Sequence, residues 1–195
     1  MTEITQAHAE WAVVDRLRTM LNERPHAQYN VTQSYGLCLA ILAWVMQRVR
    51  TPESQANSPE DRTAISVKST LDGQSVEALP WGLKTVGSEG QVPTNGDFRG
   101  FTAFNFLKWL RDASCHGDAR QVIPVNSGGT LRGFEFRASA RNDRERTLVL
   151  TERDLRRIGL GLAAMYCQAL QSAASPSSNN FVEEAQSMRE KRIAA

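Results

Sequence analysis

The sequence predicts a mainly α-helical domain with a small antiparallel β-sheet in its second half. Two observations lead to this fold class. Apolar residues recur at intervals of three and four, the period of a helix with one buried face, in four separate segments. Between the third and fourth segments, alternating apolar and polar residues around a glycine turn are typical of paired strands. We therefore expect four to five helices, with a β-hairpin or meander inserted between the third and fourth core helices.

The first two helical segments cover residues 4–21 and 31–49. In the first, charged residues lie off a single apolar stripe, and Pro25 follows as a helix breaker. The second is apolar nearly all round, which is typical of the central helix of a bundle. It is too short to span a bilayer and is interrupted by Gln47 and Arg48. We therefore expect no membrane as a partner.

Composition changes between residues 51 and 100, where Pro, Ser, Gly, Asn and Gln are frequent. Such a stretch is typical of a long loop or insertion. The helical period resumes after Gly100 in an aromatic-rich segment that runs to about Cys115. Gly117 then provides a helix stop.

The β insertion is expected within residues 120–150. Residues 122–125 and the alternating residues 134–137 predict two strands of a hairpin, joined through a turn at 126–129. Residues 147–150 predict a third strand.

The last core helix has a clear start signal. Thr151 is a typical N-cap residue, and Glu152 and Asp154 place negative charge in the first helical turn. Residues 174–195 begin as a Ser/Asn-rich linker and continue as a charged tail. The helical domain is therefore expected to occupy residues 1–173.

The charge composition excludes a protein that holds nucleic acid by overall charge alone. The 195-residue chain carries 23 Lys and Arg against 21 Asp and Glu, a formal net charge of +2. Nineteen of the basic residues are arginines, whose planar guanidinium suits bidentate contacts with phosphate. The same excess of arginine also arises from a GC-rich genome.

The sequence offers no metal-binding pattern and no cofactor motif. The three cysteines stand far apart, three histidines are too few for a polyhistidine site, and phosphate-loop, dinucleotide-binding and zinc-protease motifs are absent. We therefore expect no metal and no cofactor. Residues 1–10 lack the basic start and apolar run of a secretory signal, so a cytoplasmic location is expected.

Arg111 and His116 form the strongest candidate for chemistry. An imidazole can take or return a proton at neutral pH, and a guanidinium can hold the negative charge of a phosphodiester. Five residues on an ideal helix turn by roughly 500 degrees, so the two side chains diverge by about 140 degrees. They converge only if the helix loosens at His116 or if a second subunit supplies part of the site.

Arg111, Asp112 and His116 resemble the signature of the HEPN superfamily, the higher eukaryotes and prokaryotes nucleotide-binding domains. That signature is R-x(4-6)-H near the end of a core helix, with a polar residue after the arginine. The resemblance implies a HEPN-like helical bundle and a metal-independent endoribonuclease of toxin or antiviral-defence type. It further implies RNA as substrate, a site assembled across a homodimer from two Arg/His pairs, and an antitoxin or defence partner. Some members are inactive RNA-binding or scaffold modules, which is the alternative.

Three neighbours of this pair are candidate supporting residues. Lys108 and Ser114 lie within one turn of it and are candidates for contacting phosphate. Asp112 follows the arginine, where the family commonly has Asn, and would place a negative charge beside the phosphate. In the competing interpretation, Arg111 forms a surface ion pair with Asp112 or Asp118, and His116 is an ordinary feature of a helix end.

Two further patterns allow a functional and a structural interpretation. The arginine-rich stretch 132–157 is either an RNA-facing rim or, as we favour, a solvated surface with interleaved ion pairs. The aromatic residues between 101 and 109 either stack bases or, as we favour, pack in the core. A DNA-binding regulator is disfavoured, because no helix suited to a helix-turn-helix precedes the last core helix.

Overall fold

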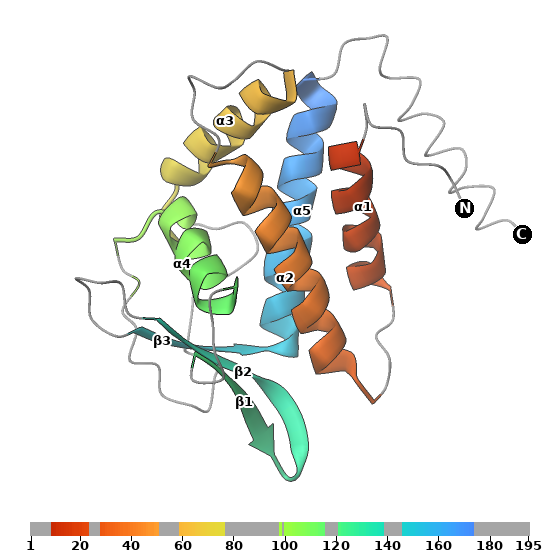
Figure 1. Cartoon of the computed structure of the whole chain (residues 1–195), viewed down its shortest axis with the longest axis vertical. Coiled ribbons are helices and arrows are strands. Elements are labelled where there is room, and N and C mark those ends of the chain that lie inside the picture. Colours follow the sequence, from red (N-terminus) through yellow and green to blue (C-terminus); the bar gives the residue numbers. More distant parts are fainter. Residues whose placement is uncertain are drawn as a thin grey trace, which may run out of the picture.

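Five helices and one three-stranded sheet make up the part of the chain that the computed structural model describes, residues 9–23, 28–50, 59–76, 98, 100–115, 121–138 and 146–173. The helices are α1 (Ala9–Asn22), α2 (Asn30–Arg48), α3 (Pro59–Asp72), α4 (Ala103–Cys115) and α5 (Glu152–Ala173). The strands are β1 (Val122–Ser127), β2 (Thr130–Ala138) and β3 (Arg146–Thr151). Figure 1 shows α1, α2 and α5 side by side, with α3 at one end of this group and the sheet at the other. The mainly α-helical class with a small antiparallel sheet is confirmed.

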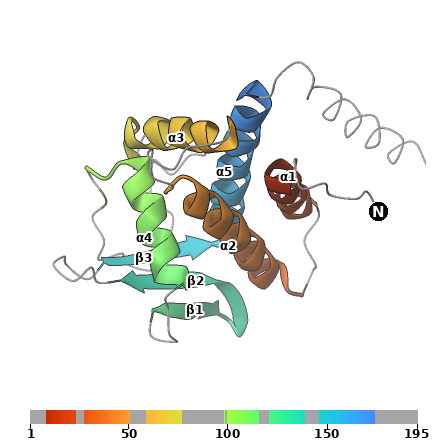
Figure 2. The same ribbon diagram turned by 45° about the horizontal axis from the view of Figure 1, so that its top comes forward.

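The packing of α2 against α5 forms the centre of the bundle. α5 packs against α1, α2 and α3, while α2 also contacts α4, and Figure 2 shows α2 between α1 and α4. The helices approach closely at Gly159 of α5, where an added Cβ would lie 2.5 Å from Leu21 Cδ2 and 3.3 Å from Cys38 Cα. A glycine at this position therefore permits the close approach of three helices.

The predicted start of α5 is confirmed by a reciprocal cap. The Thr151 backbone N–H donates to Asp154 Oδ2 at 3.0 Å, and the Asp154 backbone N–H donates to Thr151 Oγ1 at 3.3 Å. Two backbone donors that the helix itself leaves without partners are thereby satisfied. Because Thr151 is also the last residue of β3, the cap fixes the point where the sheet joins the bundle.

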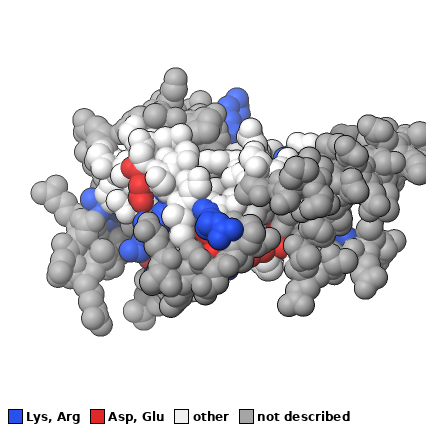
Figure 3. Space-filling model, turned by 90° about the horizontal axis from the view of Figure 1, so that it is seen from above, with Lys and Arg blue, Asp and Glu red and all other residues white. Residues whose placement is uncertain are grey.

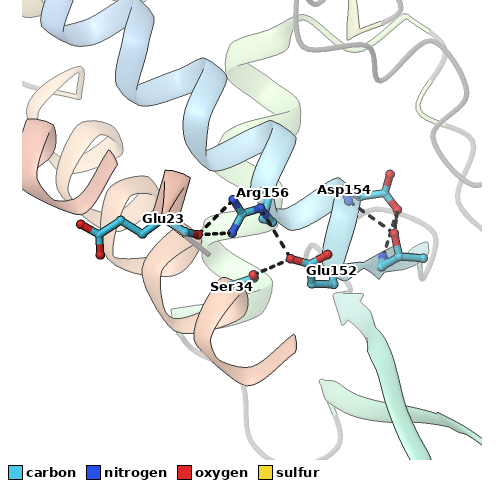
Figure 4. A network of polar contacts seen from close by, with 6 residues as sticks. Glu23, Ser34, Glu152, Asp154 and Arg156 are labelled. Atoms are coloured by element: carbon cyan, nitrogen blue, oxygen red, sulfur yellow. Dashed lines mark hydrogen bonds and ion pairs between the residues drawn. The ribbon is translucent and has the colours of Figure 1, made fainter. Parts of the chain in front are cut away.

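A polar network attaches the first turn of α5 to α1 and α2 (Figure 4). Ser34 Oγ of α2 donates to Glu152 Oε1 at 3.0 Å. Arg156, one turn further along α5, lies 3.6 Å from the same carboxylate and donates to the backbone carbonyl of Glu23 just after α1. The network therefore joins the end of α1, the start of α2 and the start of α5.

A second polar cluster joins four helices at the other end of α2. Arg48 of α2 lies 2.6 Å from Glu10 of α1 and 2.9 Å from Asp61 of α3, and Tyr166 Oη of α5 donates to Glu10 at 2.8 Å. Burial would lower the pKa of the Arg48 guanidinium, but its negatively charged neighbours outweigh burial and raise it. Burial, followed by the charge of Glu10, raises the pKa of the Tyr166 phenol. Arg48 therefore stays charged and Tyr166 keeps its proton as a hydrogen-bond donor.

The sheet has the order β1-β2-β3, and both pairs are antiparallel. All three predicted strands are confirmed. Gly128 and Gly129 have φ of +57° and +75°, the left-handed conformation that a tight hairpin turn requires. Phe134 and Phe136 of β2 face the bundle, where their ring centroids lie 4.4 Å and 6.2 Å from that of Tyr35 in α2. Aromatic packing therefore fixes the sheet against the central helix.

The expected long loop over residues 51–100 is wrong for residues 59–72, which form α3. Ala64, Val67 and Leu71 carry its buried apolar face, and the rest of the helix is mostly polar. Pro59 suggests a loop in the sequence, but proline is well tolerated in the first turn of a helix. The helix was not predicted because its apolar face is narrow and the residues around it have the composition of a loop.

Other expectations fall outside the described residues. These include the part of the first predicted helix before residue 9, the linker and tail at 174–195, and residues 77–97 of the expected insertion. Within the described helices, no stretch has both the length and the apolar character needed to cross a bilayer.

The Gly159 contact yields a first prediction. Gly159→Ala should lower the free energy of unfolding by about 1–2 kcal/mol, because steric overlap outweighs the gain in helix propensity. Gly36→Ala in α2 is the matched control, since Gly36 is exposed and an added Cβ meets no atom within 4 Å. This control should raise the free energy of unfolding by about 0.5–1 kcal/mol. Urea titration measures both values, and stabilisation by Gly159→Ala would contradict the packing described above.

Candidate functional site

The candidate site lies on α4, the helix that runs from α3 towards the sheet (Figure 1). At its start, the Asn105 backbone N–H donates to Thr102 Oγ1 at 3.1 Å, a side-chain cap. The Ala103 backbone N–H donates to the Gln74 carbonyl at 2.8 Å, which joins α4 to the residues after α3. α4 also contacts α2 and β2. It is therefore a well-supported element on which to place a functional side chain.

Arg111 lies in the second half of α4 and is bonded to its sequence neighbour Asp112. The Arg111 Nε–H donates to Asp112 Oδ1 at 2.9 Å, and Nη2 contacts the same oxygen. The Arg111 side chain is only 11% exposed, whereas that of Asp112 is 38% exposed. Adjacent residues on a helix point about 100° apart, so the guanidinium turns sideways to make this contact. The surface ion pair weighed in the sequence analysis therefore forms with Asp112.

Lys108 shares the Arg111 face of α4, because residues three apart on a helix are neighbours. Lys108 is exposed, as is Cys115, four residues beyond Arg111. Ser114 is half-buried, and its Oγ donates to the Leu110 carbonyl at 2.6 Å. The helix therefore places two cationic side chains on one face, while the Ser114 hydroxyl serves the helix backbone.

His116 directly follows the last residue of α4 in the sequence but lies outside the described residues. The structure therefore places Arg111, Asp112, Ser114 and Lys108 and does not place His116. Its approach to Arg111 stays a prediction, as do the two ways in which the pair can converge.

Tyr35 of α2 lies near the end of α4, which the sequence did not indicate. Burial raises the pKa of its phenol, and the nearby thiols of Cys115 and Cys38 raise it further. The hydroxyl therefore keeps its proton at neutral pH and can act as a hydrogen-bond donor. Seventy-six positions separate Tyr35 from Arg111 in the sequence, so no local motif links them.

The arginine-rich stretch makes several contacts within the protein. Arg137 pairs with Glu135 on β2, and Arg156 pairs with Glu152 on α5. The guanidinium of Arg146 lies 4.6 Å from the ring centroid of Phe101. These contacts agree with the interleaved surface that we favoured over an RNA-facing rim. At the opposite end of the molecule from the sheet, Figure 3 shows small basic and acidic areas among the described residues.

The aromatic residues of α4 divide between core and surface. Phe106 and Trp109 are buried, and Trp109 makes an edge contact with Phe98 at a centroid distance of 4.9 Å. Core packing is therefore confirmed for these two. Phe104 is half-buried, with Lys68 of α3 placed 5.3 Å from its ring centroid.

Within the ranges that the structure describes, no group of three or more His, Cys, Asp or Glu side chains is arranged to hold a metal ion. Comparison of the chain with known protein families, with curated proteins and with solved structures gives no match. The function must therefore be argued from the site itself.

The cysteines provide a test of the geometry at the end of α4. Cys115 is exposed, whereas Cys38 is buried and burial raises the pKa of its thiol to about 12. At pH 8 this pKa reduces the thiolate fraction on the order of a thousandfold relative to an ordinary thiol. Iodoacetamide should therefore modify Cys115 first in the folded protein and Cys38 only after denaturation, as read by peptide mass spectrometry. Equal modification of both in the folded state would contradict the burial of Cys38.

Proposed function

We propose that this chain is a metal-independent RNA endonuclease of the HEPN type, in which Arg111 binds the scissile phosphate and His116 transfers protons. The mechanism requires no cofactor. Support comes from the Arg-Asp-x-x-x-His spacing, from the mainly helical fold and from the position of Arg111 on its helix.

The observation that carries the proposal is the mostly buried side chain of Arg111, which shares a helix face with an exposed lysine. Arginine side chains usually extend into water, whereas this one is 11% exposed and held at the helix surface. A guanidinium held in such a partly desolvated place interacts more strongly with developing negative charge than one in bulk water. Lys108 on the same face is suited to hold a neighbouring phosphate of the strand.

The proposed reaction uses the ribose 2′-hydroxyl as nucleophile. His116 removes the 2′-proton, the 2′-oxygen forms a bond to phosphorus, and the bond from phosphorus to the 5′-oxygen breaks. The leaving oxygen takes up a proton from the His116 imidazolium or from water, so the products are a 2′,3′-cyclic phosphate and a 5′-hydroxyl. Arg111 stabilises the extra negative charge on the pentavalent phosphate. DNA lacks the nucleophile and should resist.

The alternative is an inactive HEPN-like domain that binds RNA or acts as a scaffold. One observation favours it: Asp112 already satisfies two donors of the Arg111 guanidinium. In this alternative Arg111 maintains the end of α4, and loss of His116 would affect stability or association without affecting catalysis.

We also propose that the protein acts as a homodimer through α2 and α4, with an antitoxin or defence protein as a further partner. Thr32, Ala40, Trp44 and Gln47 form an exposed, uncharged stripe along α2. Such a stripe on a helix adjoining α4 is suited to contact a second copy of the chain.

Cleavage of a labelled single-stranded RNA in EDTA tests the proposed activity. Wild type should cleave the RNA to fragments with 2′,3′-cyclic phosphate ends. Arg111→Ala and His116→Ala should each lower the rate about 100-fold or more, because each removes a group that acts in the transition state. DNA of the same sequence should stay intact.

Arg137→Ala is the matched control, since it removes an arginine that is paired with Glu135 on the surface of β2. It should leave the rate within about twofold of wild type. Equal cleavage by wild type, Arg111→Ala and His116→Ala would refute the proposed activity, and loss of cleavage on chelation would refute its metal independence.

Sedimentation velocity tests the proposed dimer. Ala40→Glu places a charge in the middle of the α2 stripe and should convert a dimer to a monomer, because an unpaired charge in an interface is costly. Ala164→Glu makes the same change at an exposed position of α5 and should leave the dimer intact. A monomeric wild type, or equal sedimentation of both variants, would contradict the use of this stripe.

A further inference from the structure

Asp112 covers part of the donor surface of Arg111. A guanidinium offers five N–H donors, and its Nε and Nη2 side suits bidentate binding of a phosphate. In the structure both of these nitrogens contact Asp112 Oδ1, with Nε at 2.9 Å. An anion that binds Arg111 through this side must therefore replace the carboxylate.

The two side chains of this ion pair differ in their exposure to solvent. Asp112 is 38% exposed, and Arg111, at 11%, is much less so. The carboxylate is therefore the more solvent-facing partner. Adjacent positions on a helix do not face each other, so the pair forms only because the arginine side chain turns towards the carboxylate. Because the carboxylate is the more exposed group, another anion reaches the pair from the side of Asp112 and takes its place, while the guanidinium stays where it is.

We propose that Asp112 is an intramolecular competitor for the RNA phosphate at Arg111. The inference rests on the proposed function of Arg111 as a phosphate ligand. In the free protein the carboxylate holds the guanidinium, and on binding a phosphodiester exchanges with it. Asp112 then remains next to the phosphate as a like charge, which further weakens binding. Asp112 is thus an affinity-limiting residue, distinct in role from Arg111 and Lys108.

The exchange favours a polyanionic strand over a single small anion. One phosphodiester carries the same charge as the carboxylate that it replaces, so the exchange at Arg111 alone gains little. An RNA strand brings further phosphates, which can contact Lys108 and other basic side chains. Once one phosphate of the strand is bound, the next phosphate is held close to the protein, which favours its binding. We therefore expect RNA to displace Asp112 and inorganic phosphate to do so poorly.

Equilibrium binding of a 2′-O-methyl RNA oligonucleotide tests the competitor. This probe lacks the 2′-hydroxyl and cannot be cleaved by the proposed route, so binding is measured apart from catalysis. Asp112→Asn keeps the size of the side chain and removes its charge. It should tighten binding about two- to fivefold, as expected for release of a partly exposed ion pair. Inorganic phosphate, used as a competing ligand, should displace the oligonucleotide only weakly from wild type.

Asp72→Asn on α3 is the matched control. Asp72 is 40% exposed and pairs with Lys68 on its own helix at 3.4 Å, so its substitution changes net charge by the same amount on a different helix. It should leave the affinity unchanged. In an Arg111→Ala background, Asp112→Asn should tighten binding much less than it does in wild type, because the two residues act as a coupled pair. Thermal unfolding midpoints of the aspartate variants should agree with wild type within about 2 °C.

The outcomes separate the competitor from the proposed function. Suppose that Arg111→Ala weakens binding, as the proposed function requires. The role of Asp112 as a competitor is then refuted if Asp112→Asn has no effect, if it weakens binding, or if it tightens binding equally in the Arg111→Ala background. The proposed function survives each of these three results. An equal gain from Asp72→Asn would also refute it, because the effect would then follow net charge. If Arg111→Ala binds the oligonucleotide as tightly as wild type, the proposed function fails and the competitor fails with it.

Discussion

The close approach of α5 to α2 and α1 at Gly159 is the constraint on which the rest of the structure depends. With no side chain at this position, α5 lies directly against Leu21 and the backbone at Cys38. The polar contacts at either end of α2 fit the same arrangement, since Ser34 bonds to Glu152 and Arg48 lies within the cluster that includes Tyr166. Because β3 leads directly into α5, the sheet is placed by the same packing. α4 then packs between α2 and β2, which determines where Arg111 stands.

Much of this fold could be predicted from local patterns. The apolar period revealed the central helix, the Thr151 cap marked the start of α5, and the two glycines of the hairpin marked its turn. α3 could not be recognised, because only three apolar residues form its buried face. Its first residue, Pro59, is also a residue type that is common in loops. The requirement for glycine at position 159 could not be predicted from the sequence either, because it arises from contacts with residues of two other helices.

The candidate site likewise has features that depend on neighbouring residues and could be predicted, and features that depend on distant residues and could not. The ion pair of Arg111 with Asp112 was among the interpretations that the sequence allowed, because the two residues are adjacent. The partial burial of Arg111 and the proximity of Tyr35 to Cys115 depend on the packing of α4 and could not be read from the chain. With a formal net charge of only +2, the chain lacks the overall charge to hold RNA, so the proposed binding depends on a few well-placed cations. The placement of Arg111 therefore matters more than the number of arginines.

The claim that most needs a direct measurement is that the Arg111 guanidinium is the phosphate ligand. Arginine Nε–Hε resonances in ¹⁵N-correlated NMR spectra report the hydrogen bonding of each guanidinium, and Arg111 can be assigned by its loss in Arg111→Ala. On titration with the 2′-O-methyl oligonucleotide, the Arg111 resonance should shift in a saturable manner, while that of Arg137, paired with Glu135 on the sheet, should stay in place. An Arg111 resonance that does not move while the oligonucleotide binds would contradict the account.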